Sequence, residues 1–268
     1  MDLGIEGRVA LVCGGSRGIG RAICDELLVA GCHVLIVGRD EQRLHQVVEH
    51  MKERGGSVAG LCADLLDLET YRLAVHEAVR AFGVPEIAIF NGLSPKSGAF
   101  DALCEQDFTD AHHALVNCFA RMVREVAPGM KRAAWGRILT IGSNVAKQPF
   151  RGGRDVHYAL ANTERIAAVG LSKTLSAEMA PFGITVNTIL TGAIATESAR
   201  DWCRTQASEA GLEETAFLQQ FITARIPVGR MGTPKEIASL TAFLCSALAG
   251  YTTGETVLCD GGVSQAMI

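Results

Sequence analysis

Residues 8–30, RVALVCGGSRGIGRAICDELLVA, decide the fold. The apolar run RVALVC has the length and composition of a buried strand, and the run RAICDELLVA has helical spacing. Between them Gly14, Gly18 and Gly20 form a G-x3-G-x-G turn. Glycines at a strand-to-helix turn let the backbone approach a pyrophosphate, whose charge meets free N–H groups and the helix dipole. The stretch therefore predicts a nucleotide-binding loop.

The same alternation of short and long runs continues along the chain. Further strands are predicted in HVLIV, SVAGLCA, EIAIF, RILTI, ITVNTIL and ETVLCD, with helical segments between them. Because these runs are apolar on both faces, they fit central parallel strands covered by helices. We expect a single α/β domain over residues 1–268, a Rossmann-type doubly wound parallel sheet of about seven strands flanked by helices.

Composition and charge exclude several classes of partner. The chain has 268 residues, of which 48% are hydrophobic and 20% charged, and its net charge is −4. That charge gives no broad attraction to nucleic acid or to an anionic membrane. The start MDLGIEGR has acids where a signal peptide needs basic residues, and VALVC is too short to span a membrane. We expect a cytoplasmic protein that binds neither nucleic acid nor membrane.

The cysteines and histidines show no metal-binding pattern. Nine cysteines include no CxxC pair, so reduced and mostly buried thiols are expected. His112 and His113 lie near Asn117 on a predicted helix, but no third ligand has metal spacing with them. We interpret them as surface or interface histidines and predict no metal site.

One stretch interrupts the alternation. Residues 193–226 follow a predicted strand end and mix helical apolar spacing with polar turns. In open α/β sheets, ligands bind outside the carboxyl ends of the strands. The stretch therefore predicts a substrate lid, with a plain surface insertion as the alternative.

Residues near the glycine loop bear on the choice of cofactor. Arg39 follows the second strand, where an adenosine ribose should lie, and Arg17 is in the loop itself. Both would meet a 2′-phosphate, which predicts NADP(H); an acid in place of Arg39 would favour NAD, and Asp40 is adjacent. Asp64 closes the third strand and would accept a hydrogen bond from the adenine amino group, unless it serves as a helix cap.

Taken together, the motifs resemble the short-chain dehydrogenase/reductase family, particularly its 3-oxoacyl-(acyl carrier protein) reductase-like members, over almost the whole chain. They occur in the family's order: CGGSRGIG, CAD at Asp64, FNG at Asn91, Asn117 in LVNCF, Ser143 in ILTIGS, Tyr158, VNTILTG, and the ending IPVGRMGTPKEIA through TGETVLCDGG.

The resemblance implies a reaction and a set of residues. In the family a serine and a tyrosine hydrogen-bond the substrate carbonyl, the tyrosine passes the proton, and an asparagine anchors a relay water. Ser143, Tyr158 and Asn117 match these three positions. Hydride transfer to a ketone or 3-oxoacyl-type carbonyl with Tyr158 as general acid is implied, or the reverse for an alcohol, in a homotetramer.

The implied cofactor-binding residues are Gly14, Ser16, Arg17, Gly18, Ile19, Gly20, Arg39, Asp64, Leu65, Asn91, Gly92, Tyr158, Asn162, Ile194 and Thr196. Each catalytic position also has a plainer interpretation: a turn cap for Ser143, a helix polar residue for Asn117 and a half-buried aromatic for Tyr158.

The most informative departure from the family pattern is Asn162. It lies four residues after Tyr158, where the family carries a lysine that lowers the pKa of the tyrosine and holds the nicotinamide ribose. Residues four apart share a helix face, but an asparagine supplies no charge to a phenol whose isolated pKa is about 10. Lys147 and His157 are candidate replacements, although both also fit as ordinary loop residues. Smaller departures are Cys13 for threonine, Phe90 for asparagine and Thr191 for proline.

Three interpretations follow. The first is an NADPH-dependent carbonyl reductase in which Asn162 still hydrogen-bonds the ribose. The second is non-redox carbonyl chemistry, isomerase or lyase, on the same fold. The third is a cofactor-binding but catalytically weak partner subunit. For the substrate, Phe100, Phe150 and the apolar residues of 193–226 suggest a medium-sized, partly hydrophobic ketone, unless they are core or subunit contacts.

Overall fold

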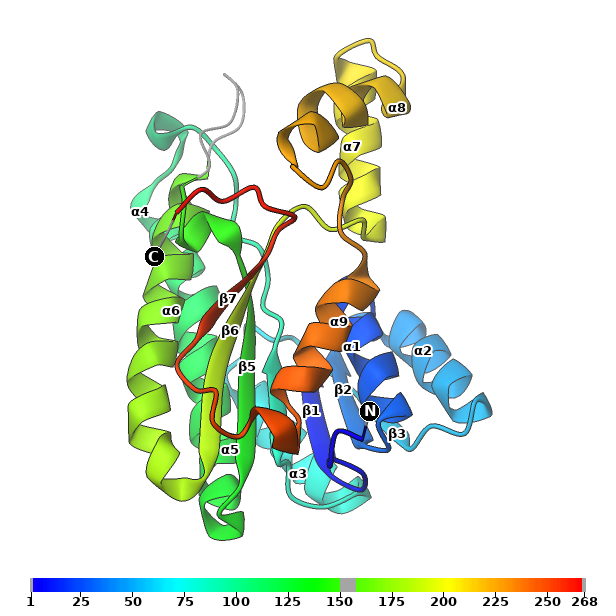
Figure 1. Ribbon diagram of the computed structural model, residues 1–268, viewed down its shortest axis with the longest axis vertical. Coiled ribbons are helices and arrows are strands. Elements are labelled where there is room, and N and C mark those ends of the chain that lie inside the picture. Colours follow the sequence, from blue (N-terminus) through cyan, green and yellow to red (C-terminus); the bar gives the residue numbers. More distant parts are fainter. Residues whose placement is uncertain (1, 150–157, 267–268) are drawn as a thin grey trace.

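Seven parallel strands form one sheet in the order β3-β2-β1-β4-β5-β6-β7 in the computed structural model, which describes residues 2–149 and 158–266 (Figure 1). The strands are β1 Val9–Cys13, β2 His33–Gly38, β3 Val58–Cys62, β4 Ile87–Phe90, β5 Gly136–Ser143, β6 Ile184–Thr191 and β7 Thr256–Cys259. Each of the seven runs that the sequence marked as a strand is one, so the predicted fold is confirmed.

Helices cover both faces of this sheet. Along β1 the side chains alternate: Ala10 and Val12 pack into one apolar layer, and Val9, Leu11 and Cys13 into the other. The first layer is completed by α1 Gly18–Val29, α2 Glu41–Glu53 and α9 Pro234–Leu244. The second is completed by α3 Glu69–Ala81, α5 Cys118–Ala133 and α6 Ala159–Met179. Apolar residues on both faces of the strands thus account for a doubly covered parallel sheet.

The chain reverses its direction of winding between β1 and β4, which pair from Ala10 with Ile87 to Cys13 with Phe90. In sheets of this kind ligands bind at the carboxyl edge beside such a switch point. The residues that come next are Gly14 and Asn91, so the fold brings the glycine loop and the FNG segment together at that edge.

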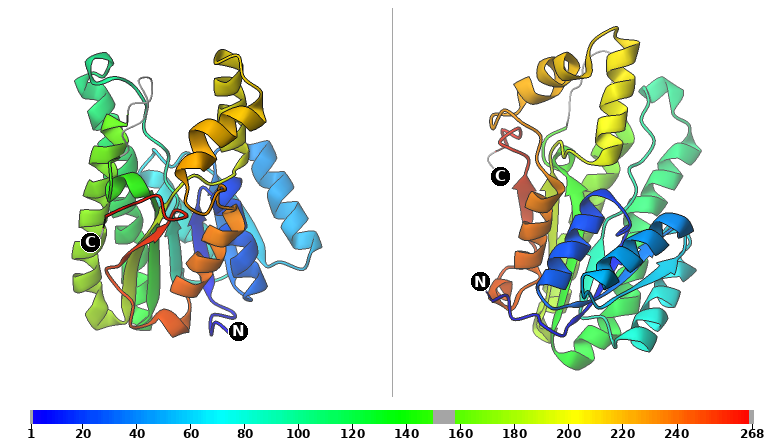
Figure 2. Two further views of the ribbon diagram at one scale, coloured as in Figure 1. Left: turned by 45° about the horizontal axis from the view of Figure 1, so that its top comes forward. Right: turned by 90° about the vertical axis from the view of Figure 1, so that its right-hand side faces the viewer.

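A helical projection rises beyond the carboxyl edge of the sheet, as Figures 1 and 2 show. It contains α7 Glu197–Glu209 and α8 Glu214–Phe217, and it corresponds to the irregular stretch 193–226. The Phe217 ring meets Trp202 edge-on and Phe221 at a tilt, with ring centroids 6.2 and 5.0 Å apart, and it packs near buried Cys203. The projection therefore has a small apolar cluster of its own.

The cysteines and the long helices bear on two expectations from the sequence. All nine cysteines lie in the described ranges and are unpaired, and six of them are buried. Burial raises the pKa of Cys13 to about 12, so this thiol at the end of β1 is unreactive. Within residues 2–149 and 158–266, no helix is long and apolar enough to cross a membrane.

Candidate active site

The glycine loop forms a tight cradle at the start of α1. Gly14 and Gly18 adopt left-handed φ values of +73° and +54°, which favour glycine. A Cβ on Gly20 would lie 2.1 Å from the carbonyl oxygen of Gly14. Asn91 donates its side-chain N–H to that same oxygen at 3.2 Å. Asn91, which follows β4, therefore holds the loop in this shape, and the position of Gly20 has no room for a side chain.

The first turn of α1 has the features of an anion site. Its N-cap residue, Arg17, makes no side-chain capping bond, so the first backbone N–H groups of the helix are not capped from that side chain. Ser16 precedes it and Ile19 packs against the core below. Free N–H groups and the positive end of a helix dipole suit a phosphate.

A cavity of about 660 Å³ adjoins the loop. It is lined by Ser16, Arg17, Gly18, Arg21, Arg43, Gln46, Val47, Ala195, Thr196, Glu197 and Pro234. Sequence reasoning selected Arg17 but missed Arg21 and Arg43. Arg21 could have been found from the sequence, because it stands in the first turn of the helix after the glycine loop. Arg43 could not, because it reaches the cavity only when α2 packs beside the loop. Arg43 forms an ion pair with Glu197 at 3.1 Å, so the base of the projection closes one side.

Arg39 and Asp40 have different roles at the end of β2. Arg39 is exposed and does not line this cavity. Asp40 is the N-cap of α2 and accepts the backbone N–H of Arg43 at 3.0 Å. The acid beside Arg39 is thus explained as a helix cap, which removes the main sequence argument for NAD.

The residues that follow β3 and β4 complete the cofactor side. Asp64 accepts the backbone N–H of Leu66 at 3.0 Å, which favours its turn-forming role and leaves its adenine contact a prediction. Leu65 packs against the core and its carbonyl accepts the Tyr71 hydroxyl. A Cβ on Gly92 would lie 2.8 Å from the ring of Phe90, so glycine there accommodates the phenylalanine that departs from the family pattern.

Three segments converge to place the predicted catalytic residues. Ser143 ends β5, and the short helix η3 Asn144–Ala146 that follows it packs against α6. Tyr158 is the N-cap of α6 and bridges to Gly98. Asn117 ends a π-helical turn, η2 His113–Asn117, which also packs against α6. Such π turns recur at functional sites, and this one lies between α4 Glu105–His112 and α5, with Asn117 as its last residue.

Burial dominates the electrostatics of Tyr158. Burial raises the pKa of Tyr158 above its ordinary value. Asn162 belongs to the first turn of α6, where its backbone N–H donates to the backbone carbonyl of Tyr158 at 2.8 Å. Its side-chain Oδ1 is buried and has no hydrogen-bond partner among the residues that the structure describes. Lys147, half-buried at the end of η3, stays a candidate cation; His157 and Phe150 lie outside the described residues.

Two residues that sequence reasoning missed support Ser143. Its hydroxyl donates to Asn144 Oδ1 at 3.5 Å, and Asn144 in turn donates to Asp260. Asp260 follows β7 and is 116 residues away in the chain, so only the strand order β5-β6-β7 brings it close.

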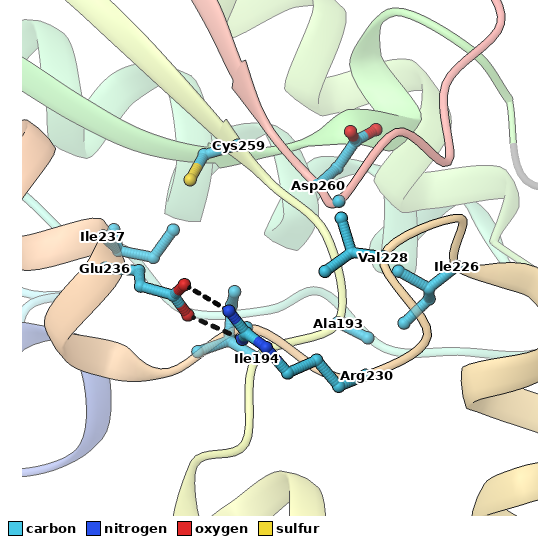
Figure 3. Close-up of a pocket in the computed structure, with 11 residues that line it drawn as sticks. Ala193, Ile194, Ile226, Val228, Arg230, Glu236, Ile237, Cys259 and Asp260 are labelled. Carbon is cyan, nitrogen blue, oxygen red and sulfur yellow. Dashed lines mark hydrogen bonds and ion pairs between the residues drawn. The ribbon is translucent and has the colours of Figure 1, made fainter.

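The two ends of the projection meet at its base, beside a cavity of about 150 Å³. Figure 3 shows the residues that line this cavity. Ala195 donates its N–H to the Gly232 carbonyl at 2.8 Å, and Gly232 donates to the Ala193 carbonyl at 3.0 Å. Ile194 is buried in the wall of the cavity. Thr196 caps α7 and lies beside Gly18. The projection is therefore anchored directly on the glycine loop.

The remaining residues singled out from the sequence lie at the surface. Phe100 is 70% exposed and stacks edge-on against Phe108. His112 bonds Glu164 at 2.8 Å, and His113 bonds the Leu66 carbonyl at 2.8 Å. In the described part of the chain, no group of three or more histidine, cysteine or acidic residues is arranged to hold a metal ion.

Known proteins resemble this chain over nearly its full length. A family model described as "Enoyl-(Acyl carrier protein) reductase" matches residues 14–264. The 3-oxoacyl-(acyl-carrier-protein) reductase FabG of Vibrio cholerae is 30% identical over 261 residues, covering 97% of this chain and 99% of the relative. The corresponding Escherichia coli protein is 32% identical over 262 residues, with the same coverage.

Solved structures show the same fold. L-sorbose reductase from Gluconobacter frateurii, complexed with NADPH and L-sorbose, superimposes with a TM-score of 0.93 at 30% identity and full coverage of both chains. An NADPH-bound short-chain oxidoreductase of Pseudomonas aeruginosa, described as containing an atypical catalytic center, gives 0.86 at 29% identity over 96% of this chain and 97% of that one. With its glycine cradle, its sheet order and these relatives, the chain belongs to the short-chain dehydrogenase/reductase family.

Proposed function

We propose that the protein is an NADPH-dependent oxidoreductase that reduces a ketone or 3-oxoacyl-type carbonyl to an alcohol. The observation that carries this proposal is the convergence at one sheet edge of a glycine cradle and the segments bearing Ser143 and Tyr158. The relatives support it, because they are named as 3-oxoacyl-(acyl-carrier-protein) reductases and as NADPH complexes.

The residues present fit a dinucleotide with a 2′-phosphate. Gly14, Gly18 and Gly20 leave bare backbone beside the uncapped start of α1, which suits the pyrophosphate. Three arginines, Arg17, Arg21 and Arg43, line the cavity beside the loop, and Arg39 follows β2 nearby in the chain. Guanidinium groups favour a phosphate over a hydroxyl, so we assign NADP(H). Ser16, Ile19, Asp64, Leu65, Asn91, Gly92, Ile194 and Thr196 complete the proposed cofactor site.

Tyr158 acts as general acid in this proposal. When bound, the reduced cofactor supplies a hydride to the carbonyl carbon. Ser143 donates a hydrogen bond to the carbonyl oxygen, and Tyr158 donates its phenol proton to that oxygen. The raised pKa of Tyr158 keeps the phenol protonated at neutral pH, which suits reduction and opposes alcohol oxidation, because oxidation needs the phenolate. Asn117 holds the water that returns a proton, and Asn162 hydrogen-bonds the ribose.

Residues 193–226 are proposed as the substrate lid. Trp202 and Phe221 keep 43% and 38% of their surface exposed on the projection. Together with exposed Phe100 at the same end of the molecule, they suit a medium-sized, partly hydrophobic ketone. The small-molecule substrate would enter between the projection and η3.

We also propose a cytoplasmic homotetramer. The motivation is a set of large apolar side chains exposed on α6, on α9 and in the segment before β7, with Ile166 at 51%, Phe243 at 41%, Leu248 at 56% and Tyr251 at 103%. Single exposed apolar residues are common, but several on neighbouring elements suit subunit contacts. Light scattering at several concentrations tests the assembly, and a monomer at all of them contradicts it.

The reductase proposal is tested by mixing the protein with NADPH and a panel of ketones and following the absorbance of the reduced cofactor. Loss of absorbance with formation of the alcohol is expected, and NADH should serve less well. The missing charge at Asn162 favours one rival, a cofactor-binding but catalytically weak subunit. Tight NADPH binding without turnover of any ketone would support that rival, and conversion of a carbonyl compound without cofactor consumption would support an isomerase or lyase.

A further inference from the structure

We infer that Arg165 is a positioning residue that acts through Asn162: after a change of side-chain rotamer, its guanidinium donates a hydrogen bond to Asn162 Oδ1 and brings a positive charge to the helix face that begins at Tyr158. This inference deepens the proposed function and rests on it. Arg165 would be the cation that assists proton transfer by Tyr158, a role that a lysine has elsewhere in the family.

The first support is the position of Arg165 on α6. Tyr158, Asn162 and Arg165 are spaced i, i+4 and i+7, which at 100° per residue places them within an arc of about 60°. Asn162 and Arg165 are three residues apart and are therefore neighbours on the helix surface. Long side chains on a helix lean toward its N-terminus. Arg165 thus reaches toward the turn that carries Asn162, and beyond it toward Tyr158.

The second support is that both groups lack partners. Asn162 Oδ1 is buried and accepts no hydrogen bond within residues 2–149 and 158–266. In the part of the chain that the structure describes, the Arg165 guanidinium makes no hydrogen bond or ion pair. A buried acceptor is costly when left unpaired, and a half-buried guanidinium gains from a hydrogen bond to it. Here the two complementary groups lie on successive turns of one helix, so a change of side-chain rotamer satisfies both.

The third support is the depth of the guanidinium. Burial lowers the pKa of Arg165 to about 10, yet its side chain is only half-buried by surface area. It therefore lies deep in the molecule, keeps some contact with solvent and is charged at neutral pH. The adjacent Glu164 does not neutralise it, because that carboxylate bonds His112 on α4 at 2.8 Å. The other segments against this half of α6 add His113, which bonds the Leu66 carbonyl, and Lys147.

The test measures the ionisation of Tyr158 directly. The chain has three tyrosines, so subtracting the ultraviolet titration of a Tyr158→Phe counterpart isolates the Tyr158 phenol. With NADP+ bound, Arg165→Met is expected to raise the pKa of Tyr158 by about one unit, and Arg165→Lys by less. Asn162→Lys in the Arg165→Met background should restore the lower value. Arg132→Met removes an exposed arginine at the end of α5 and should change nothing.

The same shift should appear in the pH dependence of alcohol oxidation, whose half-maximal point moves upward in Arg165→Met. An unchanged phenol pKa in folded Arg165→Met overturns the inference. So does a variant series in which Arg165→Met and Arg165→Lys lose assembly or folding equally, since that marks a structural arginine. If the wild-type protein turns over no ketone, the proposed reductase activity fails, while the titration still decides whether Arg165 and Tyr158 are coupled.

Discussion

Asn144 Nδ2 donates a hydrogen bond to Asp260 Oδ2 at 3.3 Å, and so joins the residue after Ser143 to the turn after β7. The same carboxylate accepts the backbone N–H groups of Gly262 and Ser264 at 3.0 and 2.9 Å. Burial alone would raise the pKa of Asp260, but hydrogen bonds from Ser264, Asn144 and Gly262 bring it below its ordinary value. The ionised carboxylate therefore fixes both the C-terminal turn and the loop that presents Ser143.

Asp260→Ala is expected to lower kcat about tenfold and to leave the affinity for NADPH nearly unchanged, because Asp260 positions Asn144 and does not reach the cofactor loop. A tenfold loss corresponds to about 1.4 kcal/mol in the transition state. Asp260→Asn keeps an acceptor and should lose less. Steady-state kinetics with a ketone substrate measure the effect. Wild-type kcat in a folded Asp260→Ala protein would show that Ser143 is held by other contacts.

Gly20→Ala tests the cradle, since its new Cβ would meet the Gly14 carbonyl oxygen at 2.1 Å. The backbone has to move, so NADPH binding should be lost and the protein destabilised by about 1–3 kcal/mol. Gly170→Ala is the matched control, because this exposed glycine inside α6 has open space around it. That change should stabilise by about 0.5–1 kcal/mol. Fluorescence titration with NADPH and thermal melting report both, and normal binding by Gly20→Ala would place the cofactor elsewhere.

Tyr158→Phe removes only the phenol oxygen and should abolish carbonyl reduction. Its effect on NADPH affinity should be small, because most of the proposed cofactor contacts come from the glycine loop and the arginines around it. Stopped-flow binding and single-turnover reduction separate the two quantities. Reduction at the wild-type rate would remove Tyr158 from the mechanism.

The fold was predictable because each strand carries its own apolar run and each turn its own glycines. Gly14, Gly18 and Gly20 need no tertiary information, since their spacing alone marks a tight strand-to-helix turn. Arg43 and Asp260 were not predictable, because α2 must first pack beside the loop and β7 beside β6 before they reach the site. Asn162 could be flagged from its place in a motif, but its unpaired oxygen and the neighbouring Arg165 became visible only with the burial of α6.

Glu236 predicts a pH dependence of stability. Hydrogen bonds from Arg230, and from the backbone and hydroxyl of Thr233, lower the pKa of Glu236 from 4.5 to about 2. Figure 3 shows the paired contacts between Arg230 and Glu236. A lowered folded-state pKa means that the stabilisation is present above pH 4.5 and is lost as the pH falls toward 2. Glu236→Gln should therefore melt below wild type at pH 7, and the difference in Tm should shrink on acidification. A difference that is constant from pH 7 to pH 3 would contradict the assignment.

Asn162→Lys restores a cation one turn from Tyr158 and should favour the phenolate. Alcohol oxidation at neutral pH requires that phenolate, so its rate should rise about tenfold or more, whereas reduction uses the neutral phenol and should rise less. Initial rates in both directions, measured on one ketone and alcohol pair across a pH series, give the ratio. Asn162→Met is the control for side-chain size without charge. If Asn162→Lys loses both directions while still binding NADPH, asparagine is needed for its own hydrogen bonds, and the altered site is a different geometry and not simply one that lacks a charge.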